Sequence, residues 1–232
     1  MFRKHPTKYW DEKKWRQYMY GYDRLLEMVD AHVKQVVDEL EKQGLLENTV
    51  IIYTSDHGDG HASHKWNQKM TFYEESVNVP FIVSWKGRTK AGYIDDATLS
   101  STGLDIFPTI LRIAGLPIPA TLHGLDMVPQ VLADPGGETL PERKYVVSEI
   151  NQLGSEFKGR MVVSANYKYI LFNGGENPEQ LFDLVKDPGE LHPVTNDPDY
   201  KNQLIAHRNM LLEWDEKIDD DDFDPAGSFP GK

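Results

Sequence analysis

The stretch Thr49-Val50-Ile51-Ile52-Tyr53-Thr54-Ser55-Asp56-His57-Gly58 decides the fold. Its first six residues are apolar or β-branched at consecutive positions, which is typical of a strand buried on both faces of a parallel sheet. Polar residues follow as soon as this run ends. In open α/β sheets, ligands bind beyond the carboxyl ends of the strands. Asp56 and His57 are therefore predicted to lie where chemistry takes place.

An amphipathic helix is predicted before this strand. Apolar and aromatic side chains recur with the spacing of one helical face, at Tyr18, Tyr22, Leu25, Leu26, Val29, Val33, Val36, Val37 and Leu40. Gly44 is predicted to end the helix, because glycine readily adopts the conformation found after helix C-termini. Residues 1–15 are polar and aromatic, and we expect them to form a surface connector.

The alternation of helices and strands continues beyond this strand. Residues 79–84 have the pattern of a second buried strand. Residues 104–114 have helical character, which Gly115 and Pro117 end. These patterns predict an α/β core over residues 1–134.

The C-terminal part of the chain has a different pattern. Candidate strands fall at residues 144–148, 160–164, 167–172 and 181–184, and an amphipathic helix at residues 200–214. Residues 135–218 are therefore predicted to form a small antiparallel sheet closed by a helix. Residues 219–232 begin with four consecutive aspartates, whose mutual repulsion favours a solvated acidic tail.

Composition limits the class of protein. With 232 residues, 39% of them hydrophobic, the chain is long enough to bury a core. The net charge of −12 disfavours a nucleic-acid partner, which needs clustered lysines and arginines. The chain has no cysteine, which excludes disulfides and a cysteine nucleophile. No apolar run is long enough to span a bilayer and no signal peptide is evident at the N-terminus, so we expect no membrane association.

The chemistry-bearing residues cluster after the decisive strand. A carboxylate and an imidazole at a strand end, here Asp56 and His57, can hold a divalent cation, and a nearby lysine such as Lys69 can bind an anion. A metal ion with a fixed ammonium offsets the charge of a sulfuryl or phosphoryl group. Taken singly, each residue also has a structural interpretation. Asp56 can form a turn, His57 can be a half-buried hydrogen-bonding residue, and His64 and Lys69 can face solvent.

A second metal hypothesis uses three histidines. His57, His61 and His64 have spacings of four and three, which would place imidazoles on one helical face as zinc ligands. Gly58 and Gly60 fall inside this window, and glycine disfavours a helix. The strand-end site is therefore the leading hypothesis.

In combination, these residues resemble the second signature block of the sulfatases, in the alkaline-phosphatase superfamily. The block is an apolar strand ending in Ser-Asp-His-Gly, a histidine five residues before Lys69, then Tyr73-Glu74 and Val79-Pro80. Stretches at residues 23–40, 104–116, 123–124, 160–163, 167–169 and 181–188 resemble further parts of the family in the same order. The resemblance implies part of an alkaline-phosphatase-like mixed sheet flanked by helices, followed by the small antiparallel sheet and its helix.

The resemblance also implies roles for the clustered residues. Asp56 and His57 correspond to two ligands of a divalent cation, for which Ca²⁺ is favoured over Mg²⁺. Lys69 corresponds to the lysine that contacts the sulfate ester, and His64 to a residue near the same group. Either can assist the leaving alkoxide, so both are predicted catalytic and substrate-binding residues. The family implies a sulfuric ester hydrolase, acting here on a sulfated sugar, in a periplasmic, secreted or lysosomal location.

One departure from the family concerns the nucleophile. Sulfatases resemble one another in an N-terminal signature of Cys or Ser, then x-Pro-x-Arg, whose first residue becomes formylglycine. Here the only Ser-x-Pro is Ser228-Phe229-Pro230, with Lys232 in place of the arginine. We therefore expect a C-terminal part of a sulfatase that lacks the formylglycine half and is inactive alone. Residues 50–54 would then expose an apolar sheet edge, which favours self-association.

Two other functions remain open on the sequence. A phosphatase or phosphonate monoester hydrolase of the same superfamily would share the metal pair and differ mainly in its nucleophile. A non-catalytic interaction domain would retain the fold without the chemistry. The pairing of Lys69 with His64 suits a sulfate group, which favours the sulfatase hypothesis.

Overall fold

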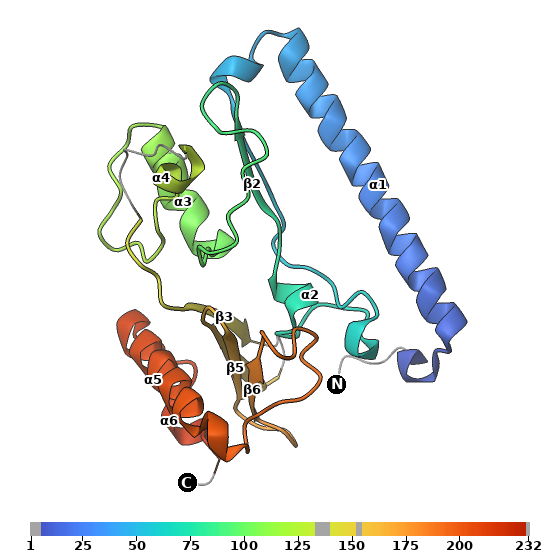
Figure 1. The fold of residues 1–232 in the computed structure, drawn as a ribbon, viewed down its shortest axis with the longest axis vertical. Helices are drawn as coiled ribbons and strands as arrows, with labels where there is room; N and C mark the ends of the chain where they lie inside the picture. The colour runs from blue at the N-terminus through green and yellow to red at the C-terminus, as the bar shows by residue number, and fades with distance from the viewer. Residues whose placement is uncertain (1–5, 133–139, 152–154, 231–232) are drawn as a thin grey trace. The chain divides into compact units, whose positions relative to one another are not determined.

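The protein is described by a computed structural model that covers residues 6–132, 140–151 and 155–230 (Figure 1). The chain forms two compact units. Unit 1 comprises Met1–Lys69, Glu75–Asp95 and Ser101–Pro141, and unit 2 comprises Met70–Glu74, Asp96–Ser100 and Glu142–Lys232. Two short segments of unit 2 thus interrupt unit 1. The predicted domain boundary at residues 134–135, the N-terminal Met1-Phe2-Arg3-Lys4 and Lys232 lie outside the described residues.

Unit 1 begins with the 3-10 helix η1 (Pro6–Tyr9) and the long helix α1 (Glu12–Lys42). The Asp11 side chain caps α1 by accepting a hydrogen bond of 2.9 Å from the Lys14 N–H. Residues 12–15 were predicted as a connector, and this prediction is wrong because the Asp11 cap starts the helix before them. The predicted end is confirmed, since Gly44 follows α1 with a φ of 68°.

Much of the predicted apolar face of α1 is exposed. Leu25 and Val36 are each 61% exposed, and Trp15 is the buried residue of the helix. Salt bridges such as Lys34 Nζ to Asp38 Oδ2, at 2.5 Å, lie on the polar side. The segment with the amphipathic pattern thus forms a helix, but the other described residues cover few of its apolar side chains. No helix in the described ranges combines the length and apolarity needed to cross a membrane.

The decisive stretch forms strand β1 (Val50–Thr54), after the 3-10 helix η2 (Leu46–Asn48). It pairs antiparallel with β2 (Phe81–Trp85), so that Ile52 lies opposite Val83. All five residues of β1 are half-buried. The prediction of a parallel strand buried on both faces is therefore wrong within the described residues. The apolar run indicates a strand but not the direction of its neighbour, and β2 is the single strand placed beside it there.

The rest of unit 1 contains α3 (Thr102–Ile113) and α4 (Val128–Leu132). Asp105 is buried and accepts backbone hydrogen bonds from Ser101 (2.7 Å) and Leu125 (2.8 Å). The Thr109 hydroxyl donates to the Asp105 carbonyl, 2.6 Å away, and accepts from the Met127 N–H at 2.9 Å. Asp105 and Thr109 therefore hold the turn that precedes α4.

Unit 2 is a four-stranded antiparallel sheet in the order β3-β4-β5-β6, with α5 packed along it (Figure 1). Its elements are β3 (Val146–Asn151), β4 (Lys158–Val163), β5 (Tyr167–Phe172), β6 (Glu179–Asp183), the 3-10 helix η4 (Pro198–Tyr200), α5 (Lys201–Ile218) and α6 (Pro225–Ser228). The core contains Val162, Tyr169, Leu171, Leu181 and Leu211. The small antiparallel sheet with a C-terminal helix is confirmed.

Residues 70–74 contribute to the interior of unit 2. Phe72 is buried, and its ring centroid lies 5.7 Å from that of Phe172. Lys168 is fully buried and forms ion pairs with Glu74 Oε1 (2.5 Å) and Glu190 Oε1 (2.7 Å). Removing one partner of a buried ion pair leaves an uncompensated charge. This segment is therefore part of the structure that the sheet needs.

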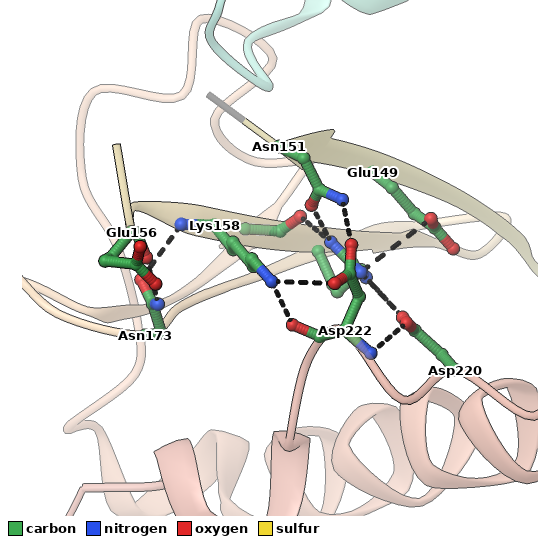
Figure 2. Close-up of polar contacts among 9 residues, drawn as sticks. Glu149, Asn151, Glu156, Lys158, Asn173, Asp220 and Asp222 are labelled. Carbon is green, nitrogen blue, oxygen red and sulfur yellow. Dashed lines mark hydrogen bonds and ion pairs between the residues drawn. The ribbon is translucent and has the colours of Figure 1, made fainter. Parts of the chain in front are cut away.

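The acidic residues that follow α5 pack against β4 (Figure 2). Arg160 is 2% exposed, and its Nη2 lies 2.6 Å from Asp220 Oδ2. Lys158 Nζ donates to the Asp222 carbonyl at 2.6 Å, and Phe223 lies buried under the Arg160 guanidinium. Burial opposes ionisation of Asp220, but the hydrogen bonds from Arg160 and from the Asp222 backbone, together with the charges of Arg160 and Lys158, outweigh it and lower the pKa of this carboxyl. Asp219, Asp221 and Asp222 are exposed, as a solvated tail predicts, but the ion pairs of Asp220 and Asp222 with cations of β4 and the burial of Phe223 hold this segment against the sheet.

A buried histidine makes unit 2 sensitive to acid. The Ser164 hydroxyl lies 2.9 Å from His207 Nε2, and His207 Nδ1 lies 2.7 Å from the Gln203 carbonyl. The carbonyl can only accept, so Nδ1 carries the proton and Nε2 accepts from Ser164. Burial lowers the pKa of His207 from its ordinary 6.5. The stability contributed by neutral His207 is present above pH 6.5 and is lost as the pH falls through the folded-state pKa.

Amide hydrogen exchange in β4 and β5 is expected to accelerate between pH 7 and pH 5, after correction for the intrinsic pH dependence of exchange. His207→Gln should reduce this pH effect, since the amide does not titrate in this range. Asp220, whose pKa is lowered, loses its contribution only below about pH 4, so the two effects are separable. Equal acceleration in the wild type and the variant would assign the effect to another group.

Candidate functional site

The candidate site lies at the carboxyl end of β1, in unit 1. The His57 backbone N–H donates to Asp56 Oδ1 at 3.0 Å, and the Ser55 hydroxyl donates to the His57 carbonyl at 2.7 Å. These local bonds fix the turn that leaves the strand. The Asp56 side chain is 83% exposed, so its second oxygen is accessible. The structure thus places Asp56 and His57 at the strand end predicted for them.

The tautomer of His57 follows from its partners. Nδ1 lies 2.7 Å from the Gly58 carbonyl, which can only accept, so Nδ1 carries the proton. Nε2 then has a free lone pair, and Lys69 Nζ donates to it at 2.6 Å. Asp56 Oδ2 lies 3.4 Å from the same nitrogen. The Asp56 carboxylate and the Lys69 ammonium therefore both lie next to His57 Nε2.

Electrostatics at this point favour an ionised carboxylate. Desolvation raises the pKa of Asp56, but its interactions with His57, including the hydrogen bond from the His57 backbone N–H, and the charge of Lys69 outweigh it. The pKa of Asp56 is therefore held below its ordinary value. An ionised carboxylate is the form that binds a metal cation.

The geometry of this pair fits part of a metal site. Two ligand atoms at right angles, each about 2.4 Å from a Ca²⁺ ion, lie about 3.4 Å apart, which matches Asp56 Oδ2 and His57 Nε2. Metal-binding histidines usually donate their second ring N–H to a carbonyl or carboxylate, as His57 does to Gly58. Two protein ligands are fewer than a calcium or magnesium ion requires. Asp56 and His57 therefore fit as part of the coordination shell of a divalent cation.

The loop that carries His64 and Lys69 has an unusual backbone. His61, Ala62, His64 and Lys65 all have positive φ, between 44° and 73°. Each such non-glycine residue costs about 1–3 kcal/mol and persists only where its surroundings hold it. His64 lies in the 3-10 helix η3 (Ser63–Lys65) and takes no part in the three contacts of His57. Its predicted role beside the sulfate group remains a prediction.

The zinc alternative depended on a helix that does not form. Residues 57–62 precede η3 and are not helical, so the three histidines do not share a helical face. His61 instead turns toward α1, where its Nε2 lies 3.2 Å from Asp23 Oδ1 and its ring 5.0 Å from Tyr22. This arrangement removes the basis of the three-histidine hypothesis.

Two residues near the site were missed by the sequence analysis. Tyr18 was assigned to the apolar face of the helix, but its hydroxyl donates to Asp59 Oδ1. Asp59 also accepts from the His61 backbone N–H at 2.8 Å. The signal available in the sequence was a carboxylate two residues after His57, without any indication of its partner 41 residues away.

Comparisons with known families decide the relationship of this chain. The model described as Sulfatase matches residues 2–116, and the model described as N-sulphoglucosamine sulphohydrolase, C-terminal, matches residues 62–217. The chain belongs to the sulfatase family. The predicted resemblance is thereby confirmed, and both matched regions include His64 and Lys69.

Individual sulfatases and their structural neighbours agree with this assignment. The Delta 4,5-hexuronate-2-O-sulfatase of Bacteroides thetaiotaomicron is 34% identical over 219 residues, which cover 92% of this chain and 44% of that protein. The solved structure of a 2-O GAG sulfatase matches with a TM-score of 0.84 and 33% identity, over 91% of this chain and 46% of the other. The phosphonate monoester hydrolase of Agrobacterium radiobacter matches with a TM-score of 0.70 and 28% identity, over 82% and 39%.

These matches fix the fold and the limits of the functional assignment. The sulfatase fold predicted from the sequence is confirmed, with its mixed α/β part and small antiparallel sheet. By family, the chain is related to sulfuric ester hydrolases. It spans less than half the length of each of the three proteins described above.

Proposed function

We propose that this chain carries part of the active site of a sulfuric ester hydrolase that acts on a sulfated sugar. The observation that supports it most is the meeting of Asp56 Oδ2 and Lys69 Nζ at His57 Nε2, at 3.4 and 2.6 Å. A cation ligand and an anion-binding ammonium thus share one strand end. This is the combination that a sulfate ester needs.

Each residue has a role in this proposal. Asp56 and His57 are ligands of a divalent cation, Ca²⁺ in preference to Mg²⁺. When bound, the cation supplies Lewis-acid polarisation of a sulfate oxygen. Lys69 neutralises another oxygen of the ester, and His64 lies near the same group. Lys69 or His64 gives the proton that the leaving alkoxide takes up.

Lys69 and the cation compete for one lone pair. The ammonium donates to His57 Nε2, the atom that would bind the metal. A cation on Nε2 therefore releases Lys69, and a released ammonium near the cation is available to an anion. The same two residues thus couple the binding of the cation to the binding of the sulfate group.

A sulfated sugar is the proposed substrate class because of the relatives. The Bacteroides thetaiotaomicron protein is named as a hexuronate-2-O-sulfatase, and the solved neighbour as a 2-O GAG sulfatase. The identity of 33–34% supports the class of substrate rather than the individual sugar. Likeness to a phosphonate monoester hydrolase keeps that activity as the second candidate.

The nucleophile is expected outside this chain. The sequence has no cysteine, and its one Ser-x-Pro, at residue 228, lacks the following arginine of the family signature. Formylglycine is therefore proposed in the part of a full-length sulfatase to which this chain does not correspond. The chain alone is expected to be inactive.

Titration with CaCl₂ and MgCl₂, followed by NMR, tests the metal half of this proposal. We expect weak binding, with a Kd on the order of 1 mM or weaker, because two ligands complete only part of a shell. Asp56→Ala should abolish the shift of the His57 signals. Asp30→Ala, which removes an exposed carboxylate of α1, should leave it unchanged. Lys69→Met should tighten binding, since it removes the competing donor.

The same preparation is assayed with an aryl sulfate, an aryl phosphate and an aryl phosphonate, and no turnover is expected. Turnover of any ester would show that the chain contains a nucleophile and would overturn its assignment as a part of the site. Cation binding that survives Asp56→Ala would remove Asp56 from the ligand set.

A further inference from the structure

The loop between His57 and Lys69 is fastened to helix α1. Tyr18 donates its hydroxyl to Asp59 Oδ1, and the same hydroxyl lies 3.4 Å from the Asn67 carbonyl. One turn later, Tyr22 packs on the His61 ring. Tyr18 and Tyr22 lie on one face of the helix because their spacing is four residues. Two adjacent turns of α1 therefore contact the first part of the loop, at Asp59 and His61, and its last part, at Asn67.

The aromatic residues at the start of α1 hold Tyr18 in place. The Trp15 and Tyr18 rings are 6.1 Å apart and nearly perpendicular, and the Trp10 ring lies 5.9 Å from Tyr18. Burial, followed by the hydrogen bond to Asp59, raises the pKa of Tyr18 above its ordinary value. The phenol therefore stays protonated and acts as a donor at physiological pH.

Gly58 lies in the sequence between His57 and Asp59, the residue that Tyr18 holds. Its backbone N–H donates to the Ser76 carbonyl at 2.9 Å, and a Cβ at Gly58 would lie 2.0 Å from the Glu75 carbonyl oxygen. The preceding peptide is thus held close to residues 75–76. The following residue, Asp59, is held by Tyr18 and by the His61 N–H. The Gly58 carbonyl is fixed from both sides, and it is the acceptor that sets the His57 tautomer.

We propose that Tyr18 and Asp59 are positioning residues of the sulfatase site, which fix the Gly58 carbonyl and through it the His57 tautomer that offers Nε2 to the cation. The proposal rests on the function proposed above for His57. Neither residue touches the cation or the sulfate group in this account. Groups that orient metal-binding histidines change metal affinity about 10–100-fold when they are removed.

The test reads the His57 tautomer directly by ¹⁵N–¹H NMR of the imidazole, with no added metal. In the wild type, the proton is expected on Nδ1. Tyr18→Phe removes one hydroxyl and should produce a mixture of both tautomers, with Ca²⁺ affinity about tenfold lower. Tyr20→Phe is the matched control, because Tyr20 lies on the same helix and is 69% exposed.

A second pair of variants separates positioning from folding. Asp59→Asn keeps a carbonyl oxygen that can accept from Tyr18 and from the His61 N–H, so it should retain the wild-type tautomer. Asp59→Ala should lose it. Because these two variants differ in one acceptor, their comparison stays informative if Tyr18→Phe unfolds.

The proposal is overturned if the His57 tautomer is the same in the wild type, Tyr18→Phe and Asp59→Ala while the backbone spectra show folded proteins. That result is distinct from failure of the proposed function. The latter appears as Ca²⁺ binding that Asp56→Ala leaves unchanged, and the tautomer measurement does not depend on it.

Discussion

Gly58→Ala is expected to abolish cation binding at Asp56 and His57. The added Cβ would lie 2.0 Å from the Glu75 carbonyl oxygen, 3.0 Å from its carbon and 3.3 Å from the Ser76 Cα. These are backbone atoms, so no side chain can move aside. The loop must shift instead, which breaks the hydrogen bond of 2.9 Å from the Gly58 N–H to the Ser76 carbonyl.

The shift moves the two ligand atoms apart, since Gly58 is bonded directly to His57. Overpacking of this kind costs about 1–3 kcal/mol in stability, and a loss of alignment at the ligands adds to the effect on binding. Binding is measured by the CaCl₂ titration, and folding by thermal unfolding. We expect a loss of affinity too large for the titration to reach saturation.

Gly103→Ala is the control for this variant. Gly103 lies in α3 of the same unit, and a Cβ there would meet no heavy atom within 4 Å. Alanine is also a better helix former than glycine, so the control should be neutral or stabilising. If Gly58→Ala bound the cation as well as Gly103→Ala does, the close approach of residues 58 and 75 would be wrong.

Arg160→Ala is expected to destabilise unit 2 by about 3–5 kcal/mol. The substitution leaves Asp220, whose side chain is 9% exposed, without the guanidinium 2.6 Å away. It also removes the hydrogen bond of 2.9 Å from Arg160 to Asn151 and the packing over Phe223. Urea unfolding, followed through hydrogen exchange in β4 and β5, measures the change.

Two further variants define the cause. Arg160→Met with Asp220→Leu removes both charges and should recover most of the loss, because an apolar pair of similar size replaces the ion pair. Arg16→Ala breaks an exposed ion pair with Glu12 and should change stability by less than about 0.5 kcal/mol. An Arg160→Ala effect as small as that of Arg16→Ala would contradict the burial of the ion pair between Arg160 and Asp220.

Local pattern predicted the elements of this chain better than their partners. The bounds of β5 were predicted to the residue, since a β-branched and aromatic run lies between turn residues. The antiparallel pairing of β2 with β1 was not predicted, because an apolar run has the same sequence pattern in a parallel and in an antiparallel sheet. The packed C-terminal residues were also missed, since the cations that neutralise Asp220 and Asp222 lie in β4, about 60 residues earlier.

The candidate site shows the same division. Spacing and family resemblance indicated that Asp56, His57 and Lys69 belong together, and the structure brings these three into contact. Their roles remain predictions. The link from Tyr18 to Asp59 had no sequence signal, because it depends on how a helix packs against a loop 41 residues away.

The contribution of residues 70–74 to unit 2 limits how this gene can recombine. An exchange with a related gene after residue 142 would transfer the whole sheet but leave behind Phe72 and Glu74, the partners of Phe172 and Lys168. In the hybrid, residue 172 and the buried residue 168 would come from one parent, and their partners at positions 72 and 74 from the other. Successful hybrids should therefore be those that inherit both segments from one parent.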